Sequence, residues 1–384
     1  MIILHTGFDG LDFALKSSAP PELVAKLEEA KALACETHTE TLVTHNGVRF
    51  KVAETGGKGG YAYRFDTGPD GATWFIKKPK PGDPWGVRIS CHSRGLGLSG
   101  LDAVRRDIEA TCDNFNLAVP PDGVSIGRVD FAVDIFSPHF KLVPEHFIMH
   151  ARSRRKTFAD LNEMQTHGPS GRFTSVTIGK QPGRQVIVYD KREEVLSKRK
   201  VEWPMIWNRN LKNMGLPELD PFDKEKSQVW RVELRMGKKA LRERGNIRGF
   251  GSLYERLQAE MNQLVQDVTL HVPSGDTNRS RWPLHPLWKV AAEAVATRLF
   301  NHIADVPPEV VRDMNLLDKQ YEFERSIASF AVTLAVLESY DVETFPFFLE
   351  RLPMRIVDFL DHHPRDTKQR FIAARKKYAE VLGA

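Results

Sequence analysis

Three segments of the sequence set ionisable residues among apolar ones in the alternation of a β-strand. They are Gly127–Phe136, Gln185–Glu194 and Trp230–Lys239. Because successive side chains of a strand point to opposite faces, the first segment places Arg128, Asp130 and Asp134 on one face and apolar residues on the other. Aspartate is depleted in strands, and like charges on one face repel each other. The two aspartates therefore predict a bound cation or neighbouring arginines.

The other two segments add arginines and a tyrosine. The third segment repeats the alternation, with Arg231, Glu233 and Arg235 on one face. The second contains Tyr189, the single tyrosine in the middle of the chain. Any one segment alone is typical of an antiparallel strand that keeps one face in solvent. As a set, carboxylates, arginines and a tyrosine indicate a metal-assisted site that acts on a phosphodiester.

The order of these motifs resembles the replication initiation factor family, which contains rolling-circle plasmid replication initiators and related relaxases of conjugative elements. The matching residues are Arg128, Asp130 and Asp134, then Tyr189-Asp190-Lys191, then Trp230-Arg231 with Glu233-Leu234-Arg235. The similarity covers roughly residues 1 to 250. It implies that a tyrosine attacks a DNA phosphate, keeps the 5′ end as a phosphotyrosine and frees a 3′ hydroxyl. Tyr189 is the matching position.

This reaction needs help from neighbouring groups. A phenol with a pKa near 10 is ionised in only about one molecule in a thousand at neutral pH. We expect Asp130, Asp134 and Glu233 to hold Mg²⁺ or Mn²⁺, since hard cations prefer oxygen ligands. Arg231 and Lys191 are the expected catalytic cations beside Tyr189. No two of the 13 histidines are spaced by one residue, so the His-hydrophobe-His metal site of other nickases is not expected.

Positive charge is concentrated around these motifs. Residues 151–250 hold 23 Lys and Arg against 12 Asp and Glu, whereas the whole chain has a net charge of only +5. Such clusters are individually typical of solvated surface, but together they predict a phosphate-binding surface. The expected DNA contacts are Arg128, Arg154, Arg155, Arg192, Arg235, Lys238 and Lys239. Trp203, Trp207 and Asn208 are candidates for stacking on unpaired bases, although burial is the commoner outcome for tryptophans.

Composition favours a cytoplasmic bacterial protein. The start of the chain lacks the pattern of a signal peptide, and no apolar run reaches the length of a membrane span. The three cysteines are odd in number and form no C-x-x-C motif, which favours reduced thiols without structural zinc. With 41% hydrophobic residues among 384, the chain can bury more than one core.

The hydrophobic pattern predicts an α+β fold with two similar antiparallel-sheet-plus-helix halves and a helical C-terminal region. Leu11-Asp12-Phe13-Ala14-Leu15 echoes Val129-Asp130-Phe131-Ala132-Val133, and the resemblance implies the same duplication. We expect residues 1–119 to be a scaffold or DNA-positioning half and 120–270 to be the catalytic half. Residues 280–384 are expected to form the helical domain.

The sequence therefore predicts a DNA strand nicking-closing enzyme that initiates rolling-circle replication or conjugative transfer. Two alternatives remain open. One is a sequence-specific origin-binding protein that does not nick, and the other is a metal nuclease that uses water and leaves Tyr189 structural. The expected partner is DNA, as origin duplex and single strand, with a helicase or a second copy of the chain as further candidates. No membrane association is expected.

Overall fold

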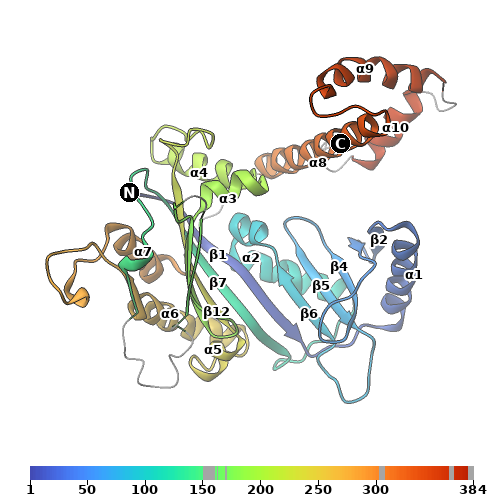
Figure 1. Ribbon diagram of the computed structural model, residues 1–384. Coiled ribbons are helices and arrows are strands. Elements are labelled where there is room, and N and C mark those ends of the chain that lie inside the picture. Colours follow the sequence, from blue (N-terminus) through green and yellow to red (C-terminus); the bar gives the residue numbers. More distant parts are fainter. Residues whose placement is uncertain (150–160, 162, 169–170, 302–307, 363–366, 379–384) are drawn as a thin grey trace. The chain divides into compact units, whose positions relative to one another are not determined.

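The computed structural model describes residues 1–149, 161, 163–168, 171–301, 308–362 and 367–378. The chain divides into two compact units, Met1–Asp305 and Val306–Ala384, and each is described by itself. The first unit is built on an antiparallel sheet of eleven strands in the order β2-β3-β4-β5-β6-β1-β7-β12-β11-β10-β9 (Figure 1). The α+β prediction is therefore confirmed.

The strands of this sheet are short except for β1 and β7 at its centre. Their bounds are β1 Ile2–Leu15, β2 Thr41–His45, β3 Val48–Val52, β4 Tyr61–Asp66, β5 Ala72–Lys77, β6 Val87–Cys91, β7 Val124–Phe136, β9 Met164–His167, β10 Ser175–Gly179, β11 Arg184–Asp190 and β12 Val229–Gly237. A separate two-stranded sheet pairs β8, Phe147–Met149, with β13, Val268–Leu270.

The strand order repeats itself across the middle of the sheet. The first strand of each half, β1 or β7, lies beside the last strand of the same half, β6 or β12. The intervening strands follow outward in reverse sequence order, and β1 pairs with β7 at the centre (Figure 1). Each last strand leads into helices. The two similar halves expected from the sequence are thus present in the topology, and the roles expected for them stay predictions.

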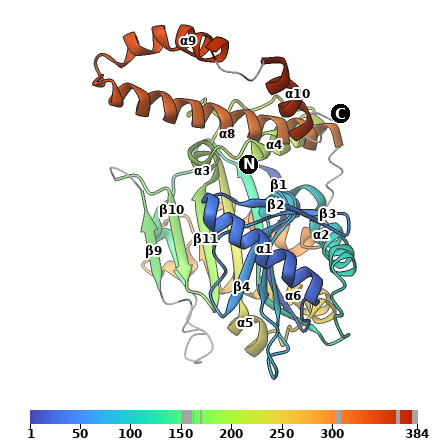
Figure 2. The ribbon, with the colours of Figure 1, turned by 90° about the vertical axis from the view of Figure 1, so that its right-hand side faces the viewer.

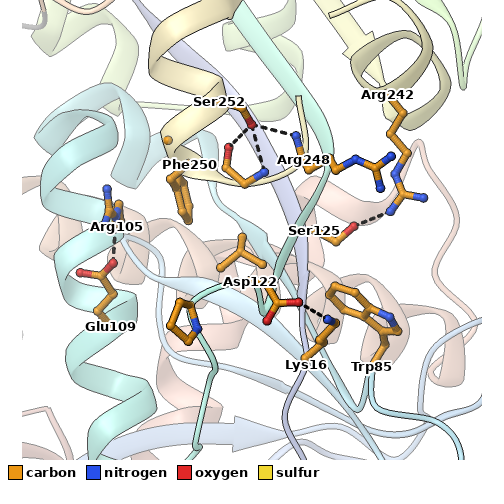
Figure 3. Close-up of a pocket in the computed structure, with 14 residues that line it drawn as sticks. Lys16, Trp85, Arg105, Glu109, Asp122, Ser125, Arg242, Arg248, Phe250 and Ser252 are labelled. Atoms are coloured by element: carbon orange, nitrogen blue, oxygen red, sulfur yellow. Dashed lines mark hydrogen bonds and ion pairs between the residues drawn. The ribbon is translucent and has the colours of Figure 1, made fainter. Parts of the chain in front are cut away.

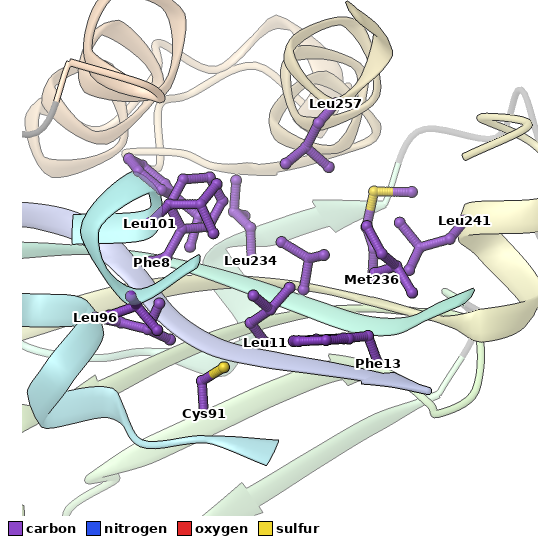
Figure 4. Close-up of a cluster of buried hydrophobic side chains, with 14 of the residues drawn as sticks. Phe8, Leu11, Phe13, Cys91, Leu96, Leu101, Leu234, Met236, Leu241 and Leu257 are labelled. Atoms are coloured by element: carbon purple, nitrogen blue, oxygen red, sulfur yellow. The ribbon is translucent and has the colours of Figure 1, made fainter. Parts of the chain in front are cut away.

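Helices cover the apolar face of the sheet. They are α1 Pro21–Thr37, α2 Ser93–Asn114, α6 Phe250–Asp267 and α7 Pro286–Arg298. Figure 4 shows Phe8, Leu11 and Leu234 of the sheet against Leu101 of α2 and Leu257 of α6. These side chains are fully or almost fully buried, and each contributes about 1.5–3 kcal/mol by leaving water. This core fixes which face of each central strand is left for polar residues.

The opposite, polar face carries the short helices α3 Lys191–Lys198 and α4 Glu202–Asn213 at one end (Figure 2). The prediction of one continuous strand over Gln185–Glu194 is wrong beyond Asp190. Asp190 is the N-cap of α3, and its side chain accepts the Glu193 N–H at 3.0 Å. A capping aspartate followed by glutamates in the first turn stabilises a helix start, so the strand ends there.

One further boundary and one additional helix differ from expectation. The third segment ends as a strand at Gly237, and Lys238 begins the short helix α5, Lys238–Glu243. Helix α1 is an addition to the expected elements, although its buried Leu23, Leu27, Ala30 and Ala34 follow helical spacing. Both differences increase the helical part of the first unit.

The second unit is helical, as the sequence predicts for the C-terminal region. It contains α8 Pro308–Leu337, α9 Phe345–His362 and α10 Thr367–Lys377. Ala331, Ala335 and Phe348 form a small buried cluster between α8 and α9. Many of its large apolar side chains are exposed, including Phe330 and Leu337. In the described part of the chain, no helix combines the length and hydropathy required to cross a membrane.

Candidate active site

The strand register arranges the predicted site residues in rows across the polar face. In one row, Tyr189 of β11 lies opposite Arg231 of β12, which lies opposite Asp134 of β7. His5 of β1 continues this row. Directly opposed residues of an antiparallel pair point to the same face, so these four side chains share one surface. Tyr189 and Arg231, which belong to separate motifs of the sequence, are thus neighbours on the sheet.

A second row lies four residues away along β7. Asp130 is opposite Arg235 of β12 and opposite Gly10 of β1. Glu233 lies between the two rows on β12, opposite Ala132. Four residues of extended strand separate Asp130 from Asp134 by about 13 Å. The expected site is therefore spread over two neighbouring rows.

Arg231 and Asp134 form a buried pair at the centre of the first row. Arg231 donates from Nε to Asp134 Oδ1 at 2.5 Å, from Nη2 to Oδ2 at 2.9 Å, and from Nη1 to Asp9 Oδ1 at 2.5 Å. Trp207 Nε1 donates to Asp134 Oδ2 at 2.9 Å. Burial alone would raise the pKa of Asp134, but the charge and hydrogen bonds of Arg231 outweigh it and hold that pKa below its usual value.

Asp9 and Trp203 complete this network, and the sequence did not predict a place in it for either. The register between β1 and β7 shifts between Phe8 and Gly10, and the irregularity turns Asp9 toward Arg231. The guanidinium carbon of Arg231 lies 4.1 Å from the ring centroid of Trp203. The adjacent Asp9-Gly10 pair inside a strand was the available signal, because glycine within a strand often marks a bulge.

The second row is also an ion-pair cluster. Arg128 donates from Nε to Asp130 Oδ1 at 3.0 Å and also bonds Asp130 Oδ2 through Nη2. Arg235 donates from Nε to Glu233 Oε1 at 2.6 Å and lies 3.6 Å from Asp130 Oδ2. Burial raises the pKa of Asp130 to about 7 against the opposing bonds from Arg128, and repulsion by Glu233 adds to the rise.

Glu233 keeps one carboxylate oxygen available. Its Oε2 atom is buried and accepts no hydrogen bond from the described residues, while Oε1 is held by Arg235. A buried carboxylate oxygen without a donor is costly to maintain. It therefore marks a place where a proton or a cation would be stabilised.

Tyr189 lies next to these groups and is half-buried. Its hydroxyl makes no hydrogen bond to the described residues, and the Lys191 ammonium lies 5.7 Å from its ring centroid. Burial raises the pKa of Tyr189 well above 10; Arg231 opposes this rise, whereas Glu233 and Asp9 reinforce it. In the free protein the phenol is thus protonated and needs a base or a cation to react.

Lys191, the other expected catalytic cation, is buried. Its Nζ donates to Glu194 Oε2 at 2.5 Å and lies 4.6 Å from the ring centroid of Trp203. Burial lowers the pKa of Lys191, and the charge of Arg231 lowers it further, against the pull of Asp9 and Asp134. A lysine in this setting gives up a proton more readily than an exposed one.

The three expected metal ligands do not converge on one point. Asp134 belongs to the row of Arg231, whereas Asp130 and Glu233 lie together in the neighbouring cluster. Within the described ranges, no three His, Cys, Asp or Glu side chains are placed to hold a metal ion. Asp130 and Glu233 still suit Mg²⁺, which usually binds through one or two carboxylates plus substrate phosphates.

The expected DNA contacts fall into three groups. Lys238 and Lys239 are exposed, while the side chains of Arg128 and Arg235 are 37% and 28% exposed. Arg192 is buried, which does not suit a surface contact. Arg154 and Arg155 lie outside the described residues.

Of the two outcomes considered for the tryptophans, burial is confirmed and stacking on bases is not. Trp203 and Trp207 are both 1% exposed and serve the Arg231 network instead. Asn208 is engaged with the backbone of Leu219 through both its side-chain oxygen and nitrogen. None of these three side chains is placed to receive a base.

Comparisons with known proteins add little to this geometry. No model of a known protein family matches the sequence, and no curated protein matches it. A solved structure titled "Structure of Rolling Circle Replication Initiator Protein from Geobacillus stearothermophilus" aligns with 77% of this chain and 98% of its own length. The identity is 13% and the TM-score is 0.38. At this level of likeness, the chemistry of the chain rests on its own residues.

Proposed function

We propose that this chain is a DNA strand nicking-closing enzyme that acts in rolling-circle replication initiation or conjugative transfer. One observation carries the proposal. The Tyr189 hydroxyl, free of hydrogen bonds to the described residues, lies on a polar sheet face among Arg231, Glu233 and Lys191. A nucleophile flanked by a base and by cations is the arrangement that phosphoryl transfer to a tyrosine requires. The motif resemblance points to the same tyrosine.

The proposed reaction uses these residues in distinct roles. The phenolic proton passes to Glu233, in the row next to Tyr189, as the tyrosine oxygen bonds to phosphorus. The bond from phosphorus to the 3′ oxygen breaks, and that oxygen takes a proton from water, because Lys191 is buried and contributes only its charge. Arg231 stays in its buried network and stabilises the developing phenolate by its charge, so it is a positioning residue. Attack of the 3′ hydroxyl on the phosphotyrosine closes the strand by the reverse route.

A divalent cation is part of the proposal. Asp130 would hold Mg²⁺ or Mn²⁺ together with the substrate phosphate and water, because the second oxygen of Glu233 accepts the phenolic proton. The cation supplies polarisation of the phosphate and neutralises charge in the transition state. Asp134 is proposed to orient Arg231 instead of binding the metal, because it lies in the other row.

The first prediction concerns the nucleophile. Tyr189→Phe is expected to abolish covalent attachment of protein to the 5′ end of DNA and to leave DNA affinity nearly unchanged, since only one hydroxyl is removed. Labelled DNA incubated with Mg²⁺ and separated on a denaturing gel measures the adduct. Tyr61→Phe, at a half-buried tyrosine of β4, is the matched control. Adducts that persist in Tyr189→Phe would show that another residue attacks.

The second prediction separates the two rows. Asp130→Asn should raise the Mg²⁺ concentration needed for half-maximal nicking, because an anionic ligand is removed. Asp134→Asn should lower nicking at every Mg²⁺ concentration and leave that midpoint in place, because it loosens Arg231. A Mg²⁺ titration of nicking measures both. If both variants shift the Mg²⁺ midpoint equally, the two rows do not have separate roles. Full nicking activity in excess EDTA would remove the metal from the proposal.

A second candidate is a DNA-binding protein that does not nick. It is favoured by the raised pKa of Tyr189 and by the ion pairs of Arg128, Arg231 and Arg235 with carboxylates. Bound but intact DNA on the same gel would support it. Nicks without an adduct would instead support a water-using nuclease.

A further inference from the structure

Figure 3 shows a cavity of about 610 Å³ beside Lys16 and Ser125, at the end of the central strands that is remote from Tyr189. Lys16 directly follows β1, and Val124 and Ser125 begin β7. Ten residues of strand β7 separate Val124 from Asp134, which corresponds to roughly 33 Å. The cavity is therefore separate from the candidate active site. Its volume is in the range of pockets that hold small organic ligands.

The side chains around this cavity are cationic and aromatic. We call it the Trp85 pocket and define it by Lys16, Trp85, Arg105, Arg242, Arg248 and Phe250. The only carboxylates among its lining residues belong to Glu109 and Asp122, so positive charge is in excess. Trp85 comes from the segment before β6, and Phe250 comes from the first turn of α6 (Figure 3).

Two of the cations are already neutralised and two are not. Lys16 pairs with Asp122 at 2.5 Å, and Arg105 pairs with Glu109 at 2.8 Å. Among the described residues, Arg242 bonds the neutral Ser125 hydroxyl, at 2.7 Å, and no carboxylate. Arg248 is exposed, and its guanidinium forms no ion pair with the described residues. Arg242 and Arg248 are thus the pair available to an anion from outside.

The aromatic residues give the pocket a second kind of chemistry. Trp85 and Phe250 are both half-buried, so part of each ring is open to the cavity. Lys16 lies 5.6 Å from the Trp85 ring centroid, and Arg105 lies 4.9 Å from that of Phe250. An aromatic surface beside arginines without a carboxylate partner suits a ligand that joins a flat ring to a phosphate.

We infer that the Trp85 pocket binds one nucleotide of a DNA single strand, with its base against Trp85 and its phosphate on Arg242 and Arg248. The inference rests on the proposed function, because it assumes that DNA is the substrate. The pocket thus anchors the strand at most about 33 Å from the tyrosine, where it fixes which phosphate reaches Tyr189.

The test measures binding of a short fluorescein-labelled oligodeoxythymidine in EDTA, where no cleavage is expected. The Arg242→Ala/Arg248→Ala double variant should bind about tenfold or more weakly, and its log-log salt slope should flatten by about 0.7 for each phosphate that is no longer bound. Trp85→Ala should weaken binding about fivefold or more, the effect of one stacked base. Arg256→Ala, at an exposed arginine of α6 that does not line the pocket, is the matched control. Unaltered affinity in the double variant overturns the inference.

A second measurement identifies the occupant. Cross-linking with 5-iodouracil in the oligonucleotide should label the peptide that contains Trp85, and the label should decrease in the double variant. Free thymidine monophosphate should compete only weakly with the oligonucleotide for this cross-link. If it removes the label as effectively as the oligonucleotide does, the pocket takes a free nucleotide and the inference about a DNA strand is overturned. The two proposals can also fail separately. If the double variant binds more weakly than the parent but the parent forms no Tyr189 adduct with DNA, the pocket is retained and the nicking function is rejected.

Discussion

At the residue scale, the candidate site is organised by charge compensation. Asp134 is ion-paired with Arg231, Asp130 with Arg128, and Glu233 with Arg235. Removing one partner of a buried pair leaves an uncompensated charge, which typically costs about 3–5 kcal/mol. Variants that break these pairs therefore test stability as well as chemistry, and folding must be measured beside activity.

The pKa of Asp130 leads to a pH prediction. Its pKa in the folded protein, about 7, lies above the ordinary value of 3.8, so between these two pH values the folded state keeps a proton that the unfolded state releases. The contribution of Asp130 to stability is then fully present below pH 3.8 and disappears as pH rises toward 7. Asp130→Asn should remove this dependence.

Urea unfolding of the parent and of Asp130→Asn across this pH range measures the difference in their free energies of unfolding. The variant should gain in free energy of unfolding relative to the parent as pH rises, and the gain should level off near pH 7. If the free energies of unfolding of the two proteins differ by the same amount at all pH values, Asp130 ionises normally in the folded protein.

At the element scale, the bulge in β1 positions both rows. It turns Asp9 toward Arg231 and brings the backbone of Gly10 against Asp130. A Cβ atom at position 10 would lie 2.6 Å from Asp130 Oδ2, closer than real Cβ atoms approach their neighbours. The glycine is thus required by close approach of two strands rather than by its backbone dihedral angles.

Gly10→Ala should therefore destabilise the protein by about 1–3 kcal/mol, the usual cost of overpacking. Gly127→Ala on the neighbouring strand is the matched control, because a Cβ atom there would meet its nearest neighbour at an ordinary 3.5 Å. Urea denaturation midpoints of the two variants give the comparison. Equal midpoints would mean that Asp130 moves aside without cost.

At the scale of the whole molecule, the charge distribution determines how the proposed DNA substrate would be held. The excess of Lys and Arg in residues 151–250 includes Lys238 and Lys239, which are exposed at the start of α5. Sequence-independent affinity from such residues falls steeply with salt, because bound phosphates release counterions. The helical unit contributes exposed apolar side chains instead, and its binding to a helicase or to a second copy stays a prediction.

A footprint of about six phosphates should give a log-log salt slope of roughly −4 to −5. Lys238→Ala/Lys239→Ala should flatten this slope by about one to two units and weaken binding to all DNA sequences alike. Lys224→Ala/Lys226→Ala is the control, since those lysines alternate with Asp223 and Glu225. Fluorescence anisotropy over a salt series measures the slopes. An unchanged slope would assign Lys238 and Lys239 to ordinary solvated surface.

The sequence by itself determined the features that depend on local alternation. Because side chains of a strand alternate between faces, it identified the polar face of β7 and β12 and the α+β class. It also singled out Tyr189 by type and motif. These inferences need only neighbouring residues, so they do not require knowledge of which strands pair.

The tertiary structure decided everything that depends on register and on contacts between distant segments. Register paired Asp134 with Arg231 and Asp130 with Arg235. Packing buried Trp203 and Trp207 beside that pair, and a bulge added Asp9. Such interactions join residues up to 222 positions apart, as between Asp9 and Arg231, and no local pattern encodes them. The Trp85 pocket likewise exists only because β1, β7, α2 and α6 meet at one end of the sheet.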